Sequence, residues 1–327
     1  MALSEWTRPK QGLENRMDNI KRYTDYNSYL RKKFGQRVQK IALDAGLSCP
    51  NRDGKLSDQG CIYCNSKGSG SGLWHQGISI KDQIEAKKIG AIKKYKAKKF
   101  LAYFQSYSNT YASCEHLKQM YDQALSCEGM VGMAIGTRPD CIDAAKLDLI
   151  ESYTDQYLVW LEYGLQSVHD RTLKLINRQH TYQDFDAAVR LTLGRRINIC
   201  THVILGLPGE NRQMMLDSAR ILADSGINGI KLHLLYVVKG TQLDKMWQQG
   251  EYVPMEQDAY VETVCDFLEL LPPEMIIQRI TGDPHPDELA APLWAAEYRQ
   301  TFNMIQKTLK TRDSFQGRHY CATRSSK

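Results

Sequence analysis

The sequence lacks several features that would each decide a class of protein. No apolar run approaches the length of a transmembrane helix, and the first residues, MALSEWTRPKQGLENR, hold no apolar stretch like that of a secretory signal. No internal repeat or low-complexity tract is visible, and the composition, 42% hydrophobic and 24% charged, excludes extensive disorder and fibrous repeats. We therefore predict a globular protein of the cytoplasm with no membrane partner.

The sequence also lacks the cysteine pattern of a disulfide framework. Its nine cysteines are an odd number, and a chain of 327 residues does not need covalent cross-links for stability. In a reducing compartment, clustered cysteines more often bind metal or catalyse. Three are clustered, with eleven residues and then two between them: Cys49, Cys61 and Cys64. The other six form no Cys-x-x-Cys pair, so a second cluster is not supported; they are interpreted as core residues or isolated thiols.

Basic residues are concentrated in three segments. Residues 1–40 carry ten basic and four acidic side chains, residues 81–99 carry eight and two, and residues 303–327 carry six and one. Lysine-rich helices are usually solvated surface. Basic segments that meet on one face could instead neutralise nucleic-acid phosphates, but charge alone favours the solvated surface.

Apolar runs alternate with helical patterns along most of the chain. The runs predict strands within 38–49, 100–108, 130–140, 157–167, 197–210 and 229–241. Helical patterns cover 80–98, 114–127, 143–153, 182–195 and 211–225. Such nearly continuous apolar strands are typical of a parallel sheet buried on both faces, in a barrel or a doubly wound fold. Functional groups then belong at the carboxyl ends of the strands.

Three regions follow from this pattern. Residues 1–37 form a basic N-terminal segment, and residues 38–253 hold the six βα units of an α/β domain. Residues 254–327 form a basic C-terminal extension, predicted to be helical over 256–271 and 287–311.

The clustered cysteines follow the first predicted strand, where such a fold keeps its active site. The residues between the first two, PNRDGKLSDQG, suit a loop that folds around a ligand. Three thiolates without a nearby fourth ligand fit a cubane iron–sulfur cluster with one open iron. They also fit zinc completed by one distant ligand, and the spacing leaves both open.

Two further segments, LEYGLQSVHDRTLKLINRQHT (161–181) and HVILGLPGE (202–210), resemble those of radical S-adenosylmethionine (SAM) enzymes, in the branch of Elongator and oxygen-independent coproporphyrinogen oxidase. The resemblance spans roughly 38–241. It implies a partial parallel (β/α)6 barrel, a [4Fe–4S] cluster held by the three cysteines, and reductive cleavage of SAM to a 5′-deoxyadenosyl radical. The segment GLPGE is not a dinucleotide fingerprint, because the G-x-G-x-x-G spacing is absent.

The same resemblance implies the residues that bind SAM. In the family an aromatic residue before the last cysteine helps hold adenine, and a motif after the second strand holds the amino group. Gln166 and Arg178 match positions that contact the ribose and carboxylate. By resemblance, the implied cofactor-binding residues are Tyr63, Gln105, Ser106, Gln166, Arg178, Ile204 and Gly206.

Over nearly its whole length the sequence is similar to the bacterial YtqA/YhcC group, known in Gram-positive bacteria as MnmL. The segments that carry this are RYTDYNSYLRKKFGQRVQKIALDAGLSCPNRDGKLSDQGCIYCN, AYFQSYSNTYA and DSFQGRHYC. The similarity implies modification of the tRNA wobble uridine, from a carboxymethylaminomethyl to an aminomethyl group on carbon 5. It also implies a low-potential electron donor such as flavodoxin or ferredoxin, and a methyltransferase that acts afterwards.

Substrate contacts are expected at the mouth of the barrel and on the basic segments. The residues assigned to them are Arg138, Asp140, Lys93, Lys94, Lys310 and Arg312. His202 and His233 lie within predicted strands and are interpreted as core residues. Two alternative functions remain open: a radical SAM enzyme that acts on a small metabolite or tetrapyrrole, and a non-catalytic zinc protein that binds nucleic acid.

Overall fold

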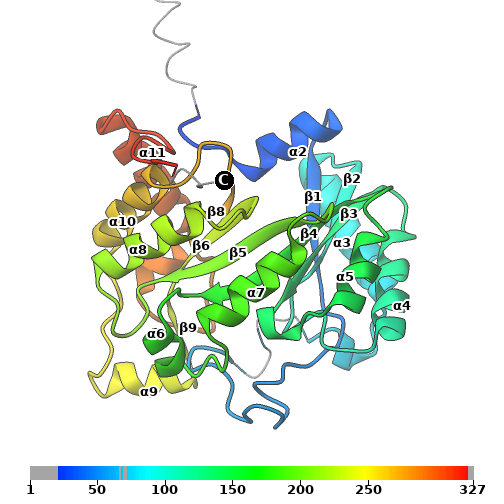
Figure 1. The fold of residues 1–327 in the computed structure, drawn as a ribbon, viewed down its shortest axis with the longest axis horizontal. Coiled ribbons are helices and arrows are strands. Elements are labelled where there is room, and N and C mark those ends of the chain that lie inside the picture. The colour runs from blue at the N-terminus through cyan, green and yellow to red at the C-terminus, as the bar shows by residue number, and fades with distance from the viewer. Residues whose placement is uncertain (1–20, 66–67, 69–71, 323–327) are drawn as a thin grey trace, which may run out of the picture.

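The computed structural model describes residues 21–65, 68 and 72–322 of the chain. Its centre is a seven-stranded parallel sheet in which the first six strands pair in chain order and β8 pairs with β6. The sheet curls into a half-barrel with helices on its outer surface (Figure 1). Its strands are β1 (Val38–Leu43), β2 (Lys99–Phe104), β3 (Met130–Thr137), β4 (Leu158–Gln166), β5 (Asn198–Leu205), β6 (Gly229–Leu234) and β8 (Ile276–Arg279).

Helices connect the strands, as expected for parallel βα units. Several begin at a side chain that accepts a backbone N–H, as Thr181 does from Asp184 in the capping box of α7. The connecting helices are α3 (Ile80–Tyr95), α4 (Cys114–Leu125), α5 (Ala144–Glu151), α6 (Asp170–Leu175), α7 (Tyr182–Thr192), α8 (Arg212–Ala223), α9 (Gln242–Gln248) and α10 (Gln257–Glu269). The predicted α/β half-barrel is confirmed, including its six strands.

The C-terminal region differs from its predicted helical pattern. It contributes the seventh strand, β8, which is only four residues long and pairs with β6. The helix predicted over 287–311 begins only at α11 (Tyr298–Thr311). Before it, β9 (Leu289–Ala291) pairs antiparallel with β7 (Val237–Val238), followed by a 3₁₀ turn, Leu293–Ala296. Pro292 explains the difference, since proline lacks a backbone N–H and disfavours helical geometry in the residue before it.

Helix α2 (Tyr26–Phe34) closes the end of the half-barrel at which the strands begin. Its Tyr26 and Leu30 belong to an apolar cluster with Trp160, whose ring meets that of Tyr26 edge to face at 5.6 Å between centroids. This helix lies in the described part, residues 21–37, of the basic N-terminal segment. Throughout the described residues, every helix is too short or too polar to span a bilayer.

The inner face of the sheet is layered because side chains alternate along each strand. In β4, Trp160 lies in the apolar floor beside α2, Glu162 lies one layer above it, and Gly164 lies nearest the ends of the strands. The floor is therefore apolar, whereas the layers above it are polar.

Candidate functional site

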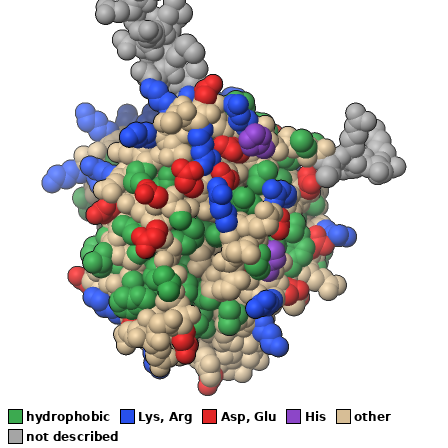
Figure 2. Space-filling view, turned by 90° about the vertical axis from the view of Figure 1, so that its left-hand side faces the viewer, with side chains coloured by type: hydrophobic (Ala, Val, Ile, Leu, Met, Phe, Trp, Pro, Cys, Tyr) green, Lys and Arg blue, Asp and Glu red, His purple; other side chains and the backbone are tan. Residues whose placement is uncertain are grey.

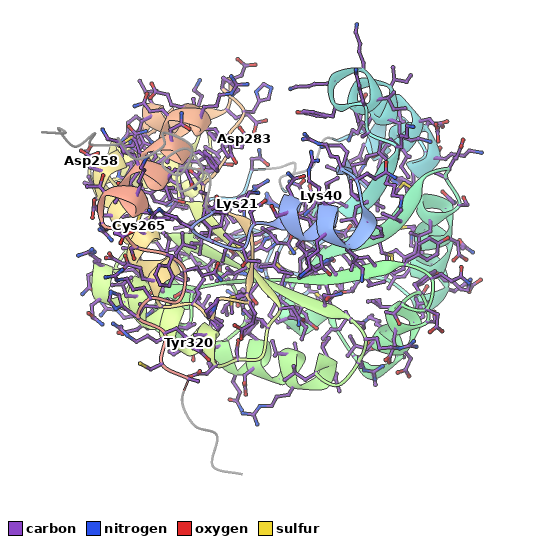
Figure 3. All side chains as sticks on the ribbon, turned by 90° about the horizontal axis from the view of Figure 1, so that it is seen from above. Lys21, Lys40, Asp258, Cys265, Asp283 and Tyr320 are labelled. Atoms are coloured by element: carbon purple, nitrogen blue, oxygen red, sulfur yellow. The ribbon has the colours of Figure 1, made fainter. Side chains whose placement is uncertain are left out.

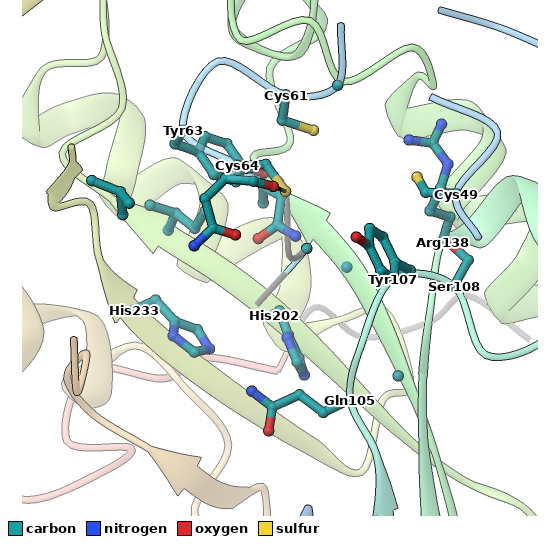
Figure 4. Close-up of a pocket in the computed structure, with 18 of the residues that line it drawn as sticks. Cys49, Cys61, Tyr63, Cys64, Gln105, Tyr107, Ser108, Arg138, His202 and His233 are labelled. Carbon is teal, nitrogen blue, oxygen red and sulfur yellow. Dashed lines mark hydrogen bonds between the residues drawn. The ribbon is translucent and has the colours of Figure 1, made fainter. Parts of the chain in front are cut away.

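A cavity of about 760 Å³ lies inside the half-barrel, above this apolar floor. Its lining includes the cysteine loop, residues that follow β2 and β3, and inward-facing residues of β4, β5, β6 and β8. Figure 4 shows the cysteines on one side and His202, His233 and Gln105 on the other. Nine residues predicted to hold the cluster or bind the cofactor or substrate line it: Cys49, Cys61, Tyr63, Cys64, Gln105, Arg138, Gln166, Arg178 and Ile204.

The cysteine loop is fastened to the loop that follows α6. Asn51 donates from Nδ2 to the carbonyl of Asn177 at 2.6 Å, and Asn177 donates from its own Nδ2 to the carbonyl of Gly60 at 2.7 Å. The backbone N–H of Ile62 donates to the carbonyl of Ile176 at 3.2 Å. These reciprocal bonds fix the cysteines relative to Arg178, the next residue of the second loop.

Arg178 is buried and points at the cysteines. Its Nη1 donates to the sulfur of Cys61 at 3.5 Å, its Nε donates to Nε2 of His180 at 2.9 Å, and its Nη2 donates to the carbonyl of Gly164. A Cβ atom at Gly164 would lie 2.8 Å from Arg178 Nη2 and 2.9 Å from Gln166 Nε2, so a larger residue there would displace the ends of both side chains.

Backbone strain is concentrated around Arg178. Gln166 has a φ of 80°, Asn177 of 53° and Gln179 of 59°, a left-handed region that residues with a Cβ atom seldom adopt. Such strain persists only where the surroundings enforce it, and it gathers at functional sites.

The two neighbouring thiols have different acidities. Burial would raise the pKa of Cys61, but the positive charge and hydrogen bond of Arg178 bring that pKa below its usual value. Burial, followed by the charge of Cys61, raises the pKa of Cys64 to about 11. The guanidinium therefore favours a thiolate at Cys61, the form that ligates metal.

Arg138 and Asp140 hold the Arg178 loop from below. Arg138 is 2% exposed and forms two hydrogen bonds to the carboxylate of Asp140, at 2.8 and 2.7 Å. It also donates to the carbonyls of Arg178, at 2.8 Å, and Gln179, at 3.2 Å. Arg138 reaches the cavity whereas Asp140 does not line it, so the visible role of the pair is to position the loop.

Of the two cofactor-binding residues predicted in the turn after β2, only one lines the cavity. Gln105 lines the cavity, whereas Ser106 is buried beside it and its carbonyl accepts Nδ2 of Asn109 at 2.9 Å. The next residues of the turn, including Ser108, line the cavity instead. The sequence alone could not show which residues of this turn face the cavity.

Tyr63 and Ile204 border the cavity together and belong to one apolar cluster. Gly206 does not line the cavity. It has a φ of 86°, its carbonyl accepts the hydroxyl of Tyr252 at 2.9 Å, and a Cβ atom there would meet Met255 at 2.9 Å. Its described contacts support the turn after β5.

Comparison with known proteins identifies the family. Residues 55–222 match the model of the Radical SAM superfamily, and residues 227–311 match that of the Radical_SAM C-terminal domain. The chain belongs to the radical SAM superfamily. It is 39% identical over 300 residues to YtqA of Bacillus subtilis, a match that covers 92% of this chain and 93% of YtqA. The predicted resemblance is confirmed.

Two further comparisons reach the Elongator-like branch. Over 156 residues the chain is 30% identical to the tRNA uridine(34) acetyltransferase of Dehalococcoides mccartyi, covering 47% of this chain and 33% of that protein. The structure of Elp3 from the archaeon Methanocaldococcus infernus is 16% identical and matches with a TM-score of 0.63, covering 85% of this chain and 64% of that one. At 16% identity, the similarity to the Elp3 structure shows a shared fold.

Radical SAM proteins bind a [4Fe–4S] cluster and SAM, and the site fits this pair. All three cysteines are free thiols that line one cavity. Two buried polar atoms of the same loop, Asn51 Oδ1 and Arg52 Nη1, have no hydrogen-bond partner. Among the described residues, no three His, Cys, Asp or Glu side chains are grouped closely enough to hold a metal ion. Family membership favours the cluster over zinc.

Sequence reasoning missed the opposite side of this radical SAM cavity. We call it the charged wall. Its members that line the cavity are Tyr103, Glu162, His202, His233 and Arg279, and Lys40 and Lys231 are counted with them because they form ion pairs with Glu162. His202 and Arg279 both pair in register with Lys231, from the strands on either side of it. The sequence did contain a signal for this wall: polar residues at every second position of an otherwise apolar strand, such as Lys231 and His233, point to the same face of the sheet.

Glu162 is the centre of the charged wall. Its side chain is 0% exposed, and its Oε1 lies 3.4 Å from Lys40 Nζ. Its Oε2 accepts from Lys231 and lies 2.9 Å from His202 Nε2. Burial opposes ionisation, but the charges of Lys231 and then Lys40 hold the pKa of Glu162 well below its usual value. His202 therefore has a hydrogen-bond partner, as the interpretation of a satisfied core histidine predicts. It also lines the cavity, which that interpretation did not predict.

The three basic segments adjoin at the opposite end of the barrel from the cysteine loop. Lys93, Lys94 and Lys96 lie where α3 ends, and the last turn of α2 carries Arg31, Lys32 and Lys33. The guanidinium of Arg37, after α2, lies 4.1 Å from the ring centroid of Tyr95, in α3. Arg22, before α2, donates to the carbonyl of Ser314 at 2.9 Å, near the end of α11.

The C-terminal basic residues differ from those of α3. Arg312 forms ion pairs with Glu262, Asp266 and Glu269, so its charge is compensated. Lys310 and Arg22 both line a surface pocket of about 860 Å³. Figure 2 shows the face over α8, α10 and α11, where basic and acidic side chains are interspersed.

Proposed function

We propose that this chain modifies the wobble uridine of tRNA by radical SAM chemistry, converting a carboxymethylaminomethyl group on carbon 5 to an aminomethyl group. The radical SAM chemistry in this proposal is supported by the three free thiols that line one cavity, beside the buried Arg178. The tRNA half is supported by the relative named as a tRNA uridine(34) acetyltransferase.

The residues divide into three roles in this proposal. Cys49, Cys61 and Cys64 hold the cluster, which together with SAM supplies a 5′-deoxyadenosyl radical. Arg178 and Gln166 orient the carboxylate and ribose of SAM, since a guanidinium pairs well with a carboxylate. Arg138 and Asp140 keep the Arg178 loop in place, and the barrel excludes water.

The tRNA backbone would bind the basic end of the barrel. The lysines at the end of α3 adjoin the basic last turn of α2, and such a surface neutralises phosphates. Lys93 and Lys94 belong to this proposal. Lys310, which has interactions of its own, and Arg312, whose charge is compensated by ion pairs, are left out of it. A cytoplasmic low-potential donor such as flavodoxin or ferredoxin would reduce the cluster, and a methyltransferase would act afterwards.

Nucleoside analysis tests the reaction. The reconstituted protein, SAM and a reductant are incubated without oxygen with tRNA from a strain that lacks the gene. We expect aminomethyluridine to appear and carboxymethylaminomethyluridine to fall, and neither change with a Cys61→Ala variant. Unchanged tRNA together with SAM cleavage stimulated by a small metabolite or tetrapyrrole would favour the alternative substrate class.

Salt dependence tests the basic surface. Replacing Lys93, Lys94 and Lys96 by glutamine should flatten the log–log slope of tRNA binding against salt by about 2 to 3, at roughly 0.7 to 0.9 per lost phosphate contact. The matched control replaces Lys118, Lys146 and Lys174, on three other helices. Equal slopes in both triple variants would remove the α3 lysines from the proposed interface.

A further inference from the structure

The charged wall contains more positive than negative charge. Lys40, Lys231 and Arg279 are basic, and Glu162 is its acidic member. The carboxylate of Glu162 is fully occupied, with Lys40 on one oxygen and Lys231 and His202 on the other. The third cation, Arg279, therefore receives no compensation from Glu162.

Arg279 has no partner among the described residues. It lies in β8, in register with Lys231, is only partly exposed, and lines the cavity. Among the described residues, the guanidinium of Arg279 forms no hydrogen bond or ion pair, even though Asp283 lines the same cavity. Figure 3 shows Asp283 and Lys40 from the end of the barrel that α2 covers. A partly desolvated guanidinium without an acceptor is unfavourable, so an anionic ligand would stabilise it.

His233 supplies a second unused donor nearby. It lies in β6 two residues after Lys231, on the same face of the strand, and its ring centroid lies 5.4 Å from that of His202. Its Nε2 is buried without a hydrogen-bond partner. Burial, and then the positive charge of Arg279, keeps the pKa of His233 well below its usual value. The ring is therefore neutral and can donate one N–H.

We propose that Arg279 and His233 form an oxyanion subsite that binds a carboxylate of the substrate. This inference rests on the proposed function, whose substrate carries such a group on its uridine side chain. A guanidinium binds a carboxylate through two parallel hydrogen bonds, and the imidazole N–H adds a third. The subsite lies inside the barrel, across the cavity from the cysteines.

A phosphodiester offers the same oxygen chemistry but fits this position less well. A phosphodiester is joined to a nucleotide on each side, so the RNA backbone would have to enter the barrel and leave it again. A terminal carboxylate needs space for one arm only.

Binding of free nucleosides to the cluster-loaded protein with SAM tests the subsite. The probes are 5-carboxymethylaminomethyluridine, 5-aminomethyluridine and uridine 5′-monophosphate. The wild-type protein should bind the carboxylate nucleoside about 10- to 100-fold more tightly than the aminomethyl one, the range for charge-assisted hydrogen bonds. Arg279→Gln should remove that preference, Arg279→Lys should keep part of it, and His233→Asn should reduce it. Arg190→Gln, an exposed arginine on α7, is the matched control.

The outcomes separate the subsite from the proposed function. Loss of preference in Arg279→Gln without any tRNA modification by the wild type would support the subsite and overturn the function. Modified tRNA with the preference intact in Arg279→Gln, or absent from the wild type, would overturn the subsite. If Arg279→Gln weakens only the binding of uridine monophosphate, the ligand is a phosphate and the carboxylate assignment is wrong. Cluster absorbance checks that each variant is folded and loaded.

Discussion

The cavity has two sides that are built in different ways. On the cysteine side, loops beyond the strand ends carry the functional groups, and hydrogen bonds to backbone carbonyls hold them, as Asn51 and Asn177 do. On the charged wall, side chains in the middle of strands carry the functional groups, and ion pairs around Glu162 hold them.

This difference separates cofactor binding from stability. A loop outside the core can change shape with modest effect on the fold, so substitutions there should affect the cofactor first. The charged wall lies within the barrel, where removing one partner leaves an uncompensated charge. Substitutions of its ion-paired members, Lys40, Glu162 and Lys231, should affect stability first. Four predictions test this contrast.

The largest effect is expected at the cysteines. Replacing Cys49, Cys61 or Cys64 by alanine should abolish the [4Fe–4S] cluster and SAM cleavage, because each residue supplies one of three ligands. The measurements are iron and sulfide content, visible absorbance and 5′-deoxyadenosine formation after anaerobic reconstitution. Cys321→Ser, at an exposed thiol, is the control. A variant of the three that retains full cluster absorbance would remove that residue from the ligand set.

Glu162→Gln should cost about 3 to 5 kcal/mol of unfolding free energy, the range for breaking a buried ion pair from one side. Lys40 and Lys231 would then lose their shared counter-charge. Denaturant titration measures the change, with the exposed Glu251→Gln as control and cluster content recorded for both. A loss below about 1 kcal/mol, or a loss of cluster without a loss of stability, would erase the contrast between the two sides.

Arg178→Ala should weaken SAM binding by about 1.5 to 3 kcal/mol, the value of a charge-assisted hydrogen bond. Asp140→Asn should have a smaller effect in the same direction, because Asp140 acts through Arg138 on the loop carbonyls. Equilibrium binding of SAM is the measurement, and the exposed Arg171→Ala, on α6, is the control. If SAM affinity is unchanged while substrate binding falls, Arg178 belongs to the substrate site.

The fourth expected effect is a change in pH dependence. Burial, and then the charge of Lys231, lowers the pKa of His202 from 6.5 to about 4. Between these values the unfolded chain takes up a proton that the folded protein excludes, so the stability contributed by His202 is lost as pH falls through this window. His202→Asn should therefore reduce the slope of unfolding free energy against pH by up to about 1.4 kcal/mol per pH unit. Identical slopes between pH 4 and 6.5 would show that His202 titrates normally in the folded protein.

The two sides also differ in how far the sequence predicts them. Cys49, Cys61 and Cys64 are close in the sequence and follow a strand, so the pattern of strands alone placed them at the mouth of the barrel. Arg178 and Gln166 required the resemblance to radical SAM enzymes, and both line the cavity with the cysteines. Ser106 and Gly206 do not, because a local turn decides which residue faces inward.

The charged wall could not be placed in this way. Lys40, Glu162, Lys231 and Arg279 come from four strands distant in the sequence, and only the curling of the sheet brings them together. β8 was missed for a related reason, since four residues give too short a pattern until β6 offers an edge to pair with.

By itself the sequence determined the alternation of strands and helices, because apolar periodicity is a local property. It also singled out the three clustered cysteines, because they are close along the chain. The tertiary structure alone decided which polar strand residues face one another inside the barrel. Their partners depend on register and curvature, which arise only when the whole sheet closes around its interior.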